Sequence, residues 1–180
     1  LFCAPATIDL AGAEIELVSL VARETRLAKA VTAYLEGQVE GERIDYVFID
    51  CPPSLGLLTI NAFVAAREVF IPIQCEYYAL EGLSQLLKNI ELIKNHLNPG
   101  LHVSSILLTM FDVRNRLSHR VVEEVRSHFG SKVFKTVIPR NVRISESPSH
   151  GLPIILYDVK SRGAAAYMDL AHEILYDGRA

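Results

Sequence analysis

Asp50 ends an apolar run, Tyr46–Asp50, and is followed at once by Cys51 and two prolines, Pro52 and Pro53. A carboxylate at the end of a buried strand can accept hydrogen bonds from magnesium-bound water, and two prolines stiffen the exit from the strand. This arrangement is typical of the metal side of a phosphate-binding site. A plain structural role is equally open at this point, because such residues also cap helices and Ser54 could start the helix that follows.

The phosphate side of such a site is absent from the sequence. It would need a glycine-rich turn with a lysine, G-x-x-x-x-G-K-[ST], whose backbone amides and ammonium group hold phosphates. No such run occurs in the 180 residues, which begin at Leu1 with a run, Leu1–Ala6, that resembles a strand already in progress. We therefore expect a chain with its N-terminal part missing, and no unaided ATP hydrolysis by it.

Polar segments follow three further apolar runs. They are Gln74–Leu83, Thr109–Arg116 and Pro139–Gly151. In parallel sheets, ligands bind outside the carboxyl ends of the strands, so these segments are the places to search for function. His119 and His150 lie in or near them, but neither has an obvious acidic partner or a second metal ligand at helical spacing. We interpret both as surface histidines.

A local basic stretch lies between Phe111 and Arg143. It holds eight basic and three acidic residues, a net +5, whereas the whole chain carries −3. The basic residues are Arg114, Arg116, Arg120, Arg126, Lys132, Lys135, Arg140 and Arg143. Such a stretch fits either an ordinary solvated surface or a polyanion-binding surface, and charge alone does not separate the two.

Length and composition predict one domain that spans residues 1–180. Half of the residues are hydrophobic, which is enough for a sizeable core. No apolar run reaches the roughly 18–20 residues of a membrane span, and the start lacks the pattern of a signal peptide. The three cysteines lack metal-site spacing and fit small buried side chains in a reducing compartment. We expect a soluble, cytoplasmic protein.

Strand and helix patterns alternate along the chain. Short apolar runs predict strands at Leu1–Ala4, Tyr46–Asp50, Val69–Ile73, Val103–Thr109 and Val133–Ile138. Apolar residues at three- and four-residue spacing predict helices at Glu14–Leu20, Glu24–Glu36, Tyr78–Leu97, Ser118–Phe129 and Gly163–Tyr176. This alternation predicts an α/β fold, a mainly parallel sheet with helices on both faces.

Several runs, in the same order, carry a resemblance to a known family. They are Pro5–Glu14, Asp50–Asn61, Gln74–Leu83, Thr136–Arg143, Pro148–Gly151 and Tyr157–Ala164. Together they cover nearly the whole chain and resemble the ParA/Soj family of chromosome and plasmid partitioning ATPases. The resemblance implies a P-loop NTPase fold whose deviant Walker A loop, with an extra signature lysine, is not among these residues.

The resemblance assigns roles to the residues around the first motif. Asp50 matches the Walker B aspartate, which acts on Mg²⁺ indirectly through metal-bound water. Pro52 and Pro53 match the switch region that senses the γ-phosphate of ATP. The expected cofactors are therefore ATP and Mg²⁺.

The resemblance also assigns roles at the other predicted strand ends. Pro139 and Asn141 match the loop that reads the adenine base, and Met110 falls in the nucleotide-binding set as well. Arg114 and Arg143 match arginines implicated in DNA binding, and both lie in the basic stretch. The coincidence favours binding of double-stranded DNA, without sequence preference, over an ordinary solvated surface.

The mechanism implied by the resemblance is a switch. ATP closes two subunits into a sandwich homodimer that binds DNA in the nucleoid, and a ParB-type centromere-binding protein stimulates hydrolysis and release. One alternative is a positioning ATPase similar to MinD on a membrane, but the terminal segment Leu170–Ala180 lacks a lysine cluster. Another is a truncated, non-enzymatic module for DNA binding or dimerisation.

Overall fold

The computed structural model describes residues 2–37, 44–52 and 54–176. The chain divides into two units, Leu1–Arg67 with Asn89–His102, and Glu68–Lys88 with Val103–Ala180. We call them the first and the second unit. Helix α4 (Ala79–His96) is continuous and contributes its beginning to the second unit and its end to the first.

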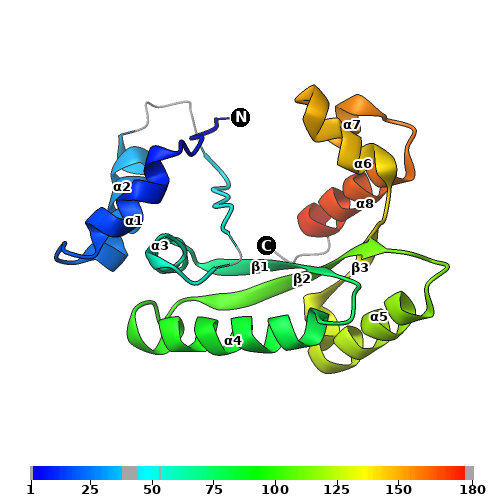
Figure 1. The fold of residues 1–180 in the computed structure, drawn as a ribbon, viewed down its shortest axis with the longest axis horizontal. Helices are drawn as coiled ribbons and strands as arrows, with labels where there is room; N and C mark the ends of the chain where they lie inside the picture. The colour runs from blue at the N-terminus through cyan, green and yellow to red at the C-terminus, as the bar shows by residue number, and fades with distance from the viewer. Residues whose placement is uncertain (1, 38–43, 53, 177–180) are drawn as a thin grey trace. The chain divides into compact units, whose positions relative to one another are not determined.

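The second unit contains a parallel sheet. The described residues form three strands in the order β1-β2-β3: β1 (Glu68–Gln74), β2 (His102–Phe111) and β3 (Val133–Pro139). β2 and β3 pair in parallel. The hydroxyl of Ser104 donates to the carbonyl of Val69, and further along both strands the hydroxyl of Thr109 donates to the carbonyl of Ile73. Because the residue numbers of the partners rise in the same direction, β1 and β2 are parallel as well. Figure 1 shows the strands side by side.

Helices cover both faces of this sheet. Helix α5 (Arg116–Phe129) and the first part of α4 lie on one face of the sheet, and α8 (Arg162–Tyr176) lies on the other (Figure 1). On the α8 side, Leu107, Phe134 and Ile138 of the sheet pack with Leu170 of the helix in one buried cluster. The predicted α/β fold with helices on both faces is confirmed. Short helices complete the unit: η2 (Gly130–Lys132), α6 (Val142–Glu146), η3 (Ser147–His150) and α7 (Ile154–Tyr157).

The first unit is organised around α3 (Leu57–Ala65), with α1 (Asp9–Leu17), η1 (Arg23–Thr25) and α2 (Arg26–Glu36). Asn61 of α3 is buried, accepts from the amide of Leu27 at 3.1 Å and donates to the carbonyl of Arg23 at 2.9 Å. At the start of α3, a carboxylate oxygen of Glu14 accepts from the amide of Leu57 at 2.8 Å. Because Glu14 satisfies this amide and Gly56 is the N-cap, Ser54 is not the cap.

Two predicted strands are wrong. The described residues of Leu1–Ala4 and of Tyr46–Asp50 adopt no regular secondary structure. Tyr46, Val47 and Phe48 are 53%, 51% and 83% exposed, although their side chains are apolar. A strand forms only where neighbouring strands satisfy its backbone groups, and no described strand pairs with this run. The other predicted strands and four of the predicted helices are confirmed, with ends shifted by a few residues. The predicted helix Glu14–Leu20 is only partly confirmed, because α1 begins five residues earlier and ends at Leu17.

Candidate functional site

The carboxyl ends of β2 and β3 meet at one edge of the sheet. Phe111 lies opposite Pro139, and the amide of Arg140 donates to the carbonyl of Phe111 at 2.9 Å. Met110 has φ +55°, a left-handed conformation that is rare for a residue with a side chain, and a register shift separates the pairs at Leu108 and Phe111. Met110 and Pro139, both predicted to bind nucleotide, therefore lie on adjacent strand ends.

Asn141 follows directly and begins α6. Its Oδ1 accepts from the amide of Arg143 at 2.8 Å, which makes Asn141 the N-cap of that helix. The side chain of Asn141 is half-buried, and its Nδ2 group has no hydrogen-bond acceptor among the described residues. The cap fixes the side chain while leaving two amide hydrogens to donate, which is what recognition of a base edge requires.

The loop after β2 presents Arg114 to solvent. Its side chain is 87% exposed, and its guanidinium lies 3.3 Å from Oδ1 of Asp112. Asp112 also accepts from the amide of Arg114 at 3.0 Å, and these two hydrogen bonds lower the pKa of its carboxyl. Asn115 caps α5 by accepting from the amide of Leu117. The turn therefore holds the backbone of Arg114 in place while its side chain faces water.

Arg143 lies in a denser polar network. Its guanidinium donates to Glu146 at 2.9 Å and lies 3.6 Å from Asp158. Glu146 also accepts from the hydroxyl of Tyr157 at 3.4 Å. The hydrogen bond that Arg143 donates to Glu146 is the main cause that raises the pKa of Arg143. Arg143 is exposed, so an external anion can reach it. That anion would lie beside the carboxylates of Glu146 and Asp158.

Two of these acidic partners were not predicted from the sequence. Glu146 lies three residues after Arg143, a spacing that places side chains on one helix face, so this pair could have been found. Asp158 lies fifteen positions away and carried no local signal. Glu76 was also missed; it binds Arg140 at 2.9 Å and links the segment after β1 to the segment after β3.

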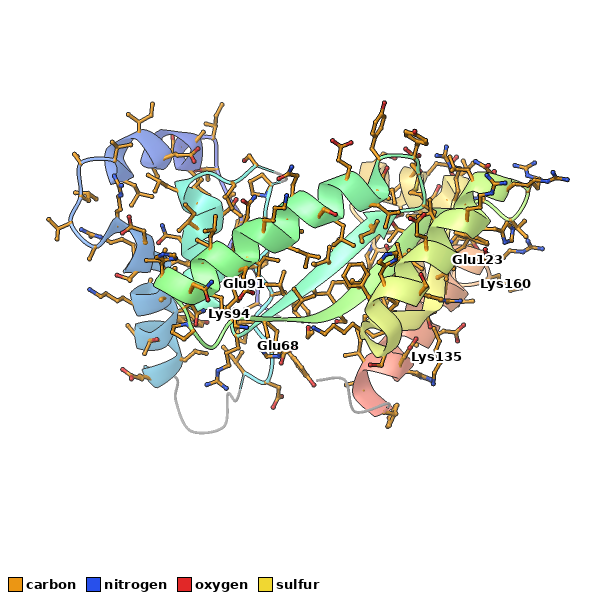
Figure 2. The ribbon with its side chains drawn as sticks, turned by 90° about the horizontal axis from the view of Figure 1, so that it is seen from below. Glu68, Glu91, Lys94, Glu123, Lys135 and Lys160 are labelled. Carbon is orange, nitrogen blue, oxygen red and sulfur yellow. The ribbon has the colours of Figure 1, made fainter. Side chains whose placement is uncertain are left out.

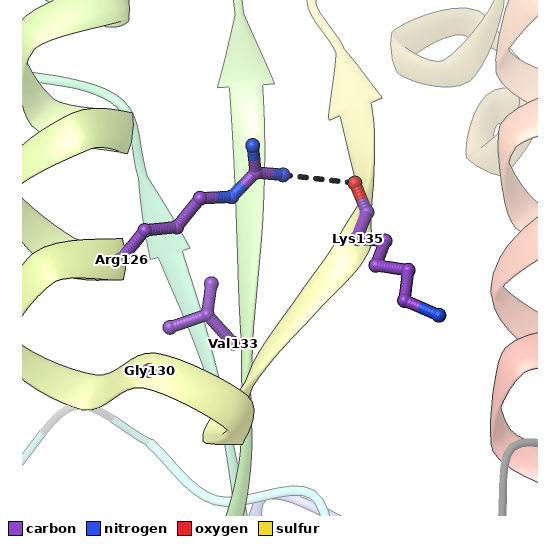
Figure 3. Close-up of a pocket in the computed structure, with 4 residues that line it drawn as sticks. All are labelled: Arg126, Gly130, Val133 and Lys135. Carbon is purple, nitrogen blue, oxygen red and sulfur yellow. Dashed lines mark hydrogen bonds between the residues drawn. The ribbon is translucent and has the colours of Figure 1, made fainter.

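A hollow of about 380 Å³ lies beside the end of α5. It is lined by Arg126, Gly130, Val133 and Lys135, and Arg126 donates to the carbonyl of Lys135 at 2.9 Å (Figure 3). The side chain of Lys135 extends away from the guanidinium of Arg126 (Figure 3). The two cations therefore do not converge on one point, and this hollow is no built anion site.

Asp50 and Pro52 belong to the first unit, whereas the other predicted site residues that the structure describes belong to the second. Asp50 is exposed, and no described residue forms a hydrogen bond or ion pair with it. Pro52 is exposed as well, and Pro53 lies outside the described residues. The charge of Asp50 adds to burial in raising the pKa of Cys51.

A free carboxylate at Asp50 fits an indirect role toward Mg²⁺. In the described ranges, no three His, Cys, Asp or Glu side chains group closely enough to hold a metal ion. Mg²⁺ is commonly bound by one or two carboxylates together with water and substrate phosphates, so one carboxylate is a sufficient protein contribution. The residues present therefore suit a magnesium ion that arrives with a nucleotide.

The parallel sheet with helices on both faces defines an α/β protein, and its similarity to known proteins places it in the P-loop ATPase class. A family model described as an AAA domain matches residues 1–103. The chain is 59% identical over 174 residues to the sporulation initiation inhibitor protein Soj of Bacillus subtilis, and 56% identical over 171 residues to the chromosome partitioning protein ParA of Myxococcus xanthus. The matches cover 97% and 95% of this chain, but 66% and 58% of the relatives, less than two thirds of their length.

A solved structure shares the fold. Cobyrinic acid a,c-diamide synthase from Mycobacterium smegmatis, with bound ATP analog and magnesium, superposes with a TM-score of 0.73 at 34% identity, covering 97% of this chain and 64% of that one. The chain belongs to the ParA/Soj family of chromosome partitioning ATPases. No helix in the described part of the chain combines the length and the apolar character needed to cross a bilayer.

Proposed function

We propose that this protein is an ATP-dependent chromosome or plasmid partitioning protein that binds double-stranded DNA without sequence preference. The observation that carries the proposal is the high identity to Soj and ParA over nearly all of the chain. The exposed arginines Arg114 and Arg143 lie beside the starts of α5 and α6, where Asp112 holds the backbone amide of Arg114 and Asn141 holds that of Arg143; both support the DNA-binding part.

The predicted site residues each have a task in this proposal. Asp50 would orient the water shell of a bound magnesium ion, and Pro52 with Pro53 would form the switch that senses the terminal phosphate. Asn141 donates its free amide hydrogens to the adenine edge, between Pro139 and Met110. Bound ATP with Mg²⁺ supplies the phosphate charge and the bond whose hydrolysis resets the switch.

The partners follow from the same proposal. Two ATP-bound subunits close into a homodimer that remains on the nucleoid in the cytoplasm, and a ParB-type centromere-binding protein stimulates hydrolysis. Release from DNA then follows loss of the dimer. Affinity for DNA comes from phosphate contacts, so it weakens steeply as salt increases.

The test is retention of nonspecific duplex DNA by the intact protein with ATP and Mg²⁺. Arg114→Ala and Arg143→Ala should each weaken retention at physiological salt, while binding of a fluorescent ATP analogue stays within about twofold, since neither arginine is in the nucleotide-binding set. Arg26→Ala, an exposed arginine that begins α2, serves as the control. Unchanged DNA retention in both Arg114→Ala and Arg143→Ala would remove the assignment.

A further inference from the structure

Two arginines of the basic stretch lie on one exposed face of α5. Arg116 and Arg120 are the first and fifth residues of the helix, and both are exposed. Residues four positions apart lie about 5–6 Å from each other, measured between Cβ atoms, on the same helix face. The opposite face is buried through Ser118, Val121 and Val125. Both side chains therefore belong to the solvent side of α5. Glu123, which is labelled in Figure 2, lies three residues after Arg120 and is exposed as well.

Arg116 and Arg120 differ from their neighbours in having no acidic partner. Arg114 is paired with Asp112 and Arg143 with two carboxylates. Among the residues that the structure describes, no Asp or Glu forms an ion pair with Arg116 or Arg120, although Glu123 and Glu124 begin only one turn later. No ion pair among the described residues therefore neutralises either guanidinium group.

Helix stability does not explain these positions. Like charges four residues apart destabilise a helix by a few tenths of a kcal/mol. Cations near a helix N-terminus also oppose the helix dipole, and α5 has no acidic residue in its first turn to offset them. Glu123 and Glu124, three and four residues after Arg120, offset part of this cost without forming an ion pair, so an anion from outside the chain would still be a favourable partner for both arginines.

We propose that Arg116 and Arg120 bind two backbone phosphates of double-stranded DNA, extending the DNA-facing surface from the loop of Arg114 along α5. The inference rests on the proposed function. Successive phosphates along one strand and two guanidinium groups one helical turn apart have similar spacing, and arginine binds phosphate in a bidentate manner. Neither arginine has to break an ion pair within the chain before it binds a phosphate.

The size of the effect follows from counterion release. Each phosphate neutralised contributes about 0.9 to the slope of log K against log salt, so the loss of two contacts reduces the slope by about 1.8 per subunit. At a salt concentration of about 0.15 M this corresponds to roughly 30-fold weaker binding for each subunit engaged.

The experiment measures the salt dependence of duplex binding by fluorescence anisotropy, using the intact protein with ATP and Mg²⁺. The Arg116→Ala/Arg120→Ala variant should show the reduced slope. The charge-conserving Arg116→Lys/Arg120→Lys variant should keep most of the wild-type slope. Arg26→Ala, also an exposed helix-initial arginine, is the matched control and should keep the wild-type slope. Because alanine favours the helix, the double alanine variant should melt no lower than wild type.

The outcomes separate the two proposals. Wild-type protein that fails to bind DNA with ATP and Mg²⁺ would overturn the proposed function and this inference with it. Wild-type binding together with an unchanged slope in Arg116→Ala/Arg120→Ala would overturn the inference and leave the proposed function standing. An equal loss of slope in Arg26→Ala would also overturn the inference, because the slope would then depend on the net charge of the protein and not on the position of Arg116 and Arg120.

Discussion

Removing the carboxylate of Glu173 should destabilise the sheet that carries Pro139 and Asn141. Glu173 lies on α8 and is 7% exposed. Its two carboxylate oxygens accept from the amide of Lys135 at 2.7 Å and from the amide of Thr136 at 2.9 Å. These amides lie where β3 is irregular, so the carboxylate joins α8 to β3 at a point where the ladder to β2 is interrupted.

The magnitude follows from these two bonds. A hydrogen bond to a charged group contributes about 1.5–3 kcal/mol, and an amide left without an acceptor costs about 1–3 kcal/mol when it is shielded from water. Since both amides are partly buried, Glu173→Ala should lower the free energy of unfolding by about 3–5 kcal/mol. Glu173→Gln keeps one oxygen acceptor and should lose about half as much. At roughly 2–4 °C per kcal/mol for a chain of this size, the alanine variant should melt about 10 °C lower.

The assay is urea-induced unfolding of the intact protein, combined with hydrogen exchange at the amides of residues 135 and 136. The two amides should lose protection in Glu173→Ala before the rest of β3 does. Glu124→Ala, an exposed glutamate of α5, is the control and should change stability by less than about 0.5 kcal/mol. If Glu173→Ala stays within about 1 kcal/mol of wild type with both amides protected, the reasoning is refuted.

Two further predictions concern a half-buried amide and a buried thiol. Asn98 donates to the carbonyls of Phe63 at 2.9 Å and Ala66 at 2.7 Å at the end of α3, so Asn98→Ala should cost about 1–3 kcal/mol in urea unfolding; an unchanged midpoint would contradict this. Burial raises the pKa of Cys75 to about 11, so at pH 8 iodoacetamide should label exposed Cys3 in the folded protein but Cys75 only after unfolding. The neutral thiol favours the folded state below its ordinary pKa, and this contribution is lost as pH rises toward 11; rapid labelling of Cys75 in folded protein would refute its burial.

The strands of the second unit could be predicted from the sequence because each is a short apolar run that the structure buries within the sheet. In β1 the burial alternates residue by residue, with Val69, Ile71 and Ile73 inside. The predicted strand Tyr46–Asp50 has equally apolar residues, yet it stays exposed. Whether an apolar run becomes a strand depends on partners elsewhere, and no pattern within the run reports them.

The candidate site divides in the same way. Arg114 and Arg143 were chosen because they match arginines of the ParA/Soj family, and the count of charges along the sequence supplied only the basic stretch in which both lie. The pairing of Arg143 with Asp158 and the left-handed backbone of Met110 could not be predicted, since both arise from the packing of distant segments. The exposed pair on α5 was present in the basic stretch, but only the structure distinguishes it from arginines that already have acidic partners.

The most direct test of the central claim is Mg²⁺-dependent ATP hydrolysis by the intact protein, measured with DNA and its centromere-binding partner, for wild type and Asp50→Ala. The account predicts stimulated turnover in wild type and none above background in Asp50→Ala, with unchanged thermal stability because Asp50 is exposed and has no partner among the described residues. Normal turnover in Asp50→Ala would contradict the role of this carboxylate at the magnesium ion.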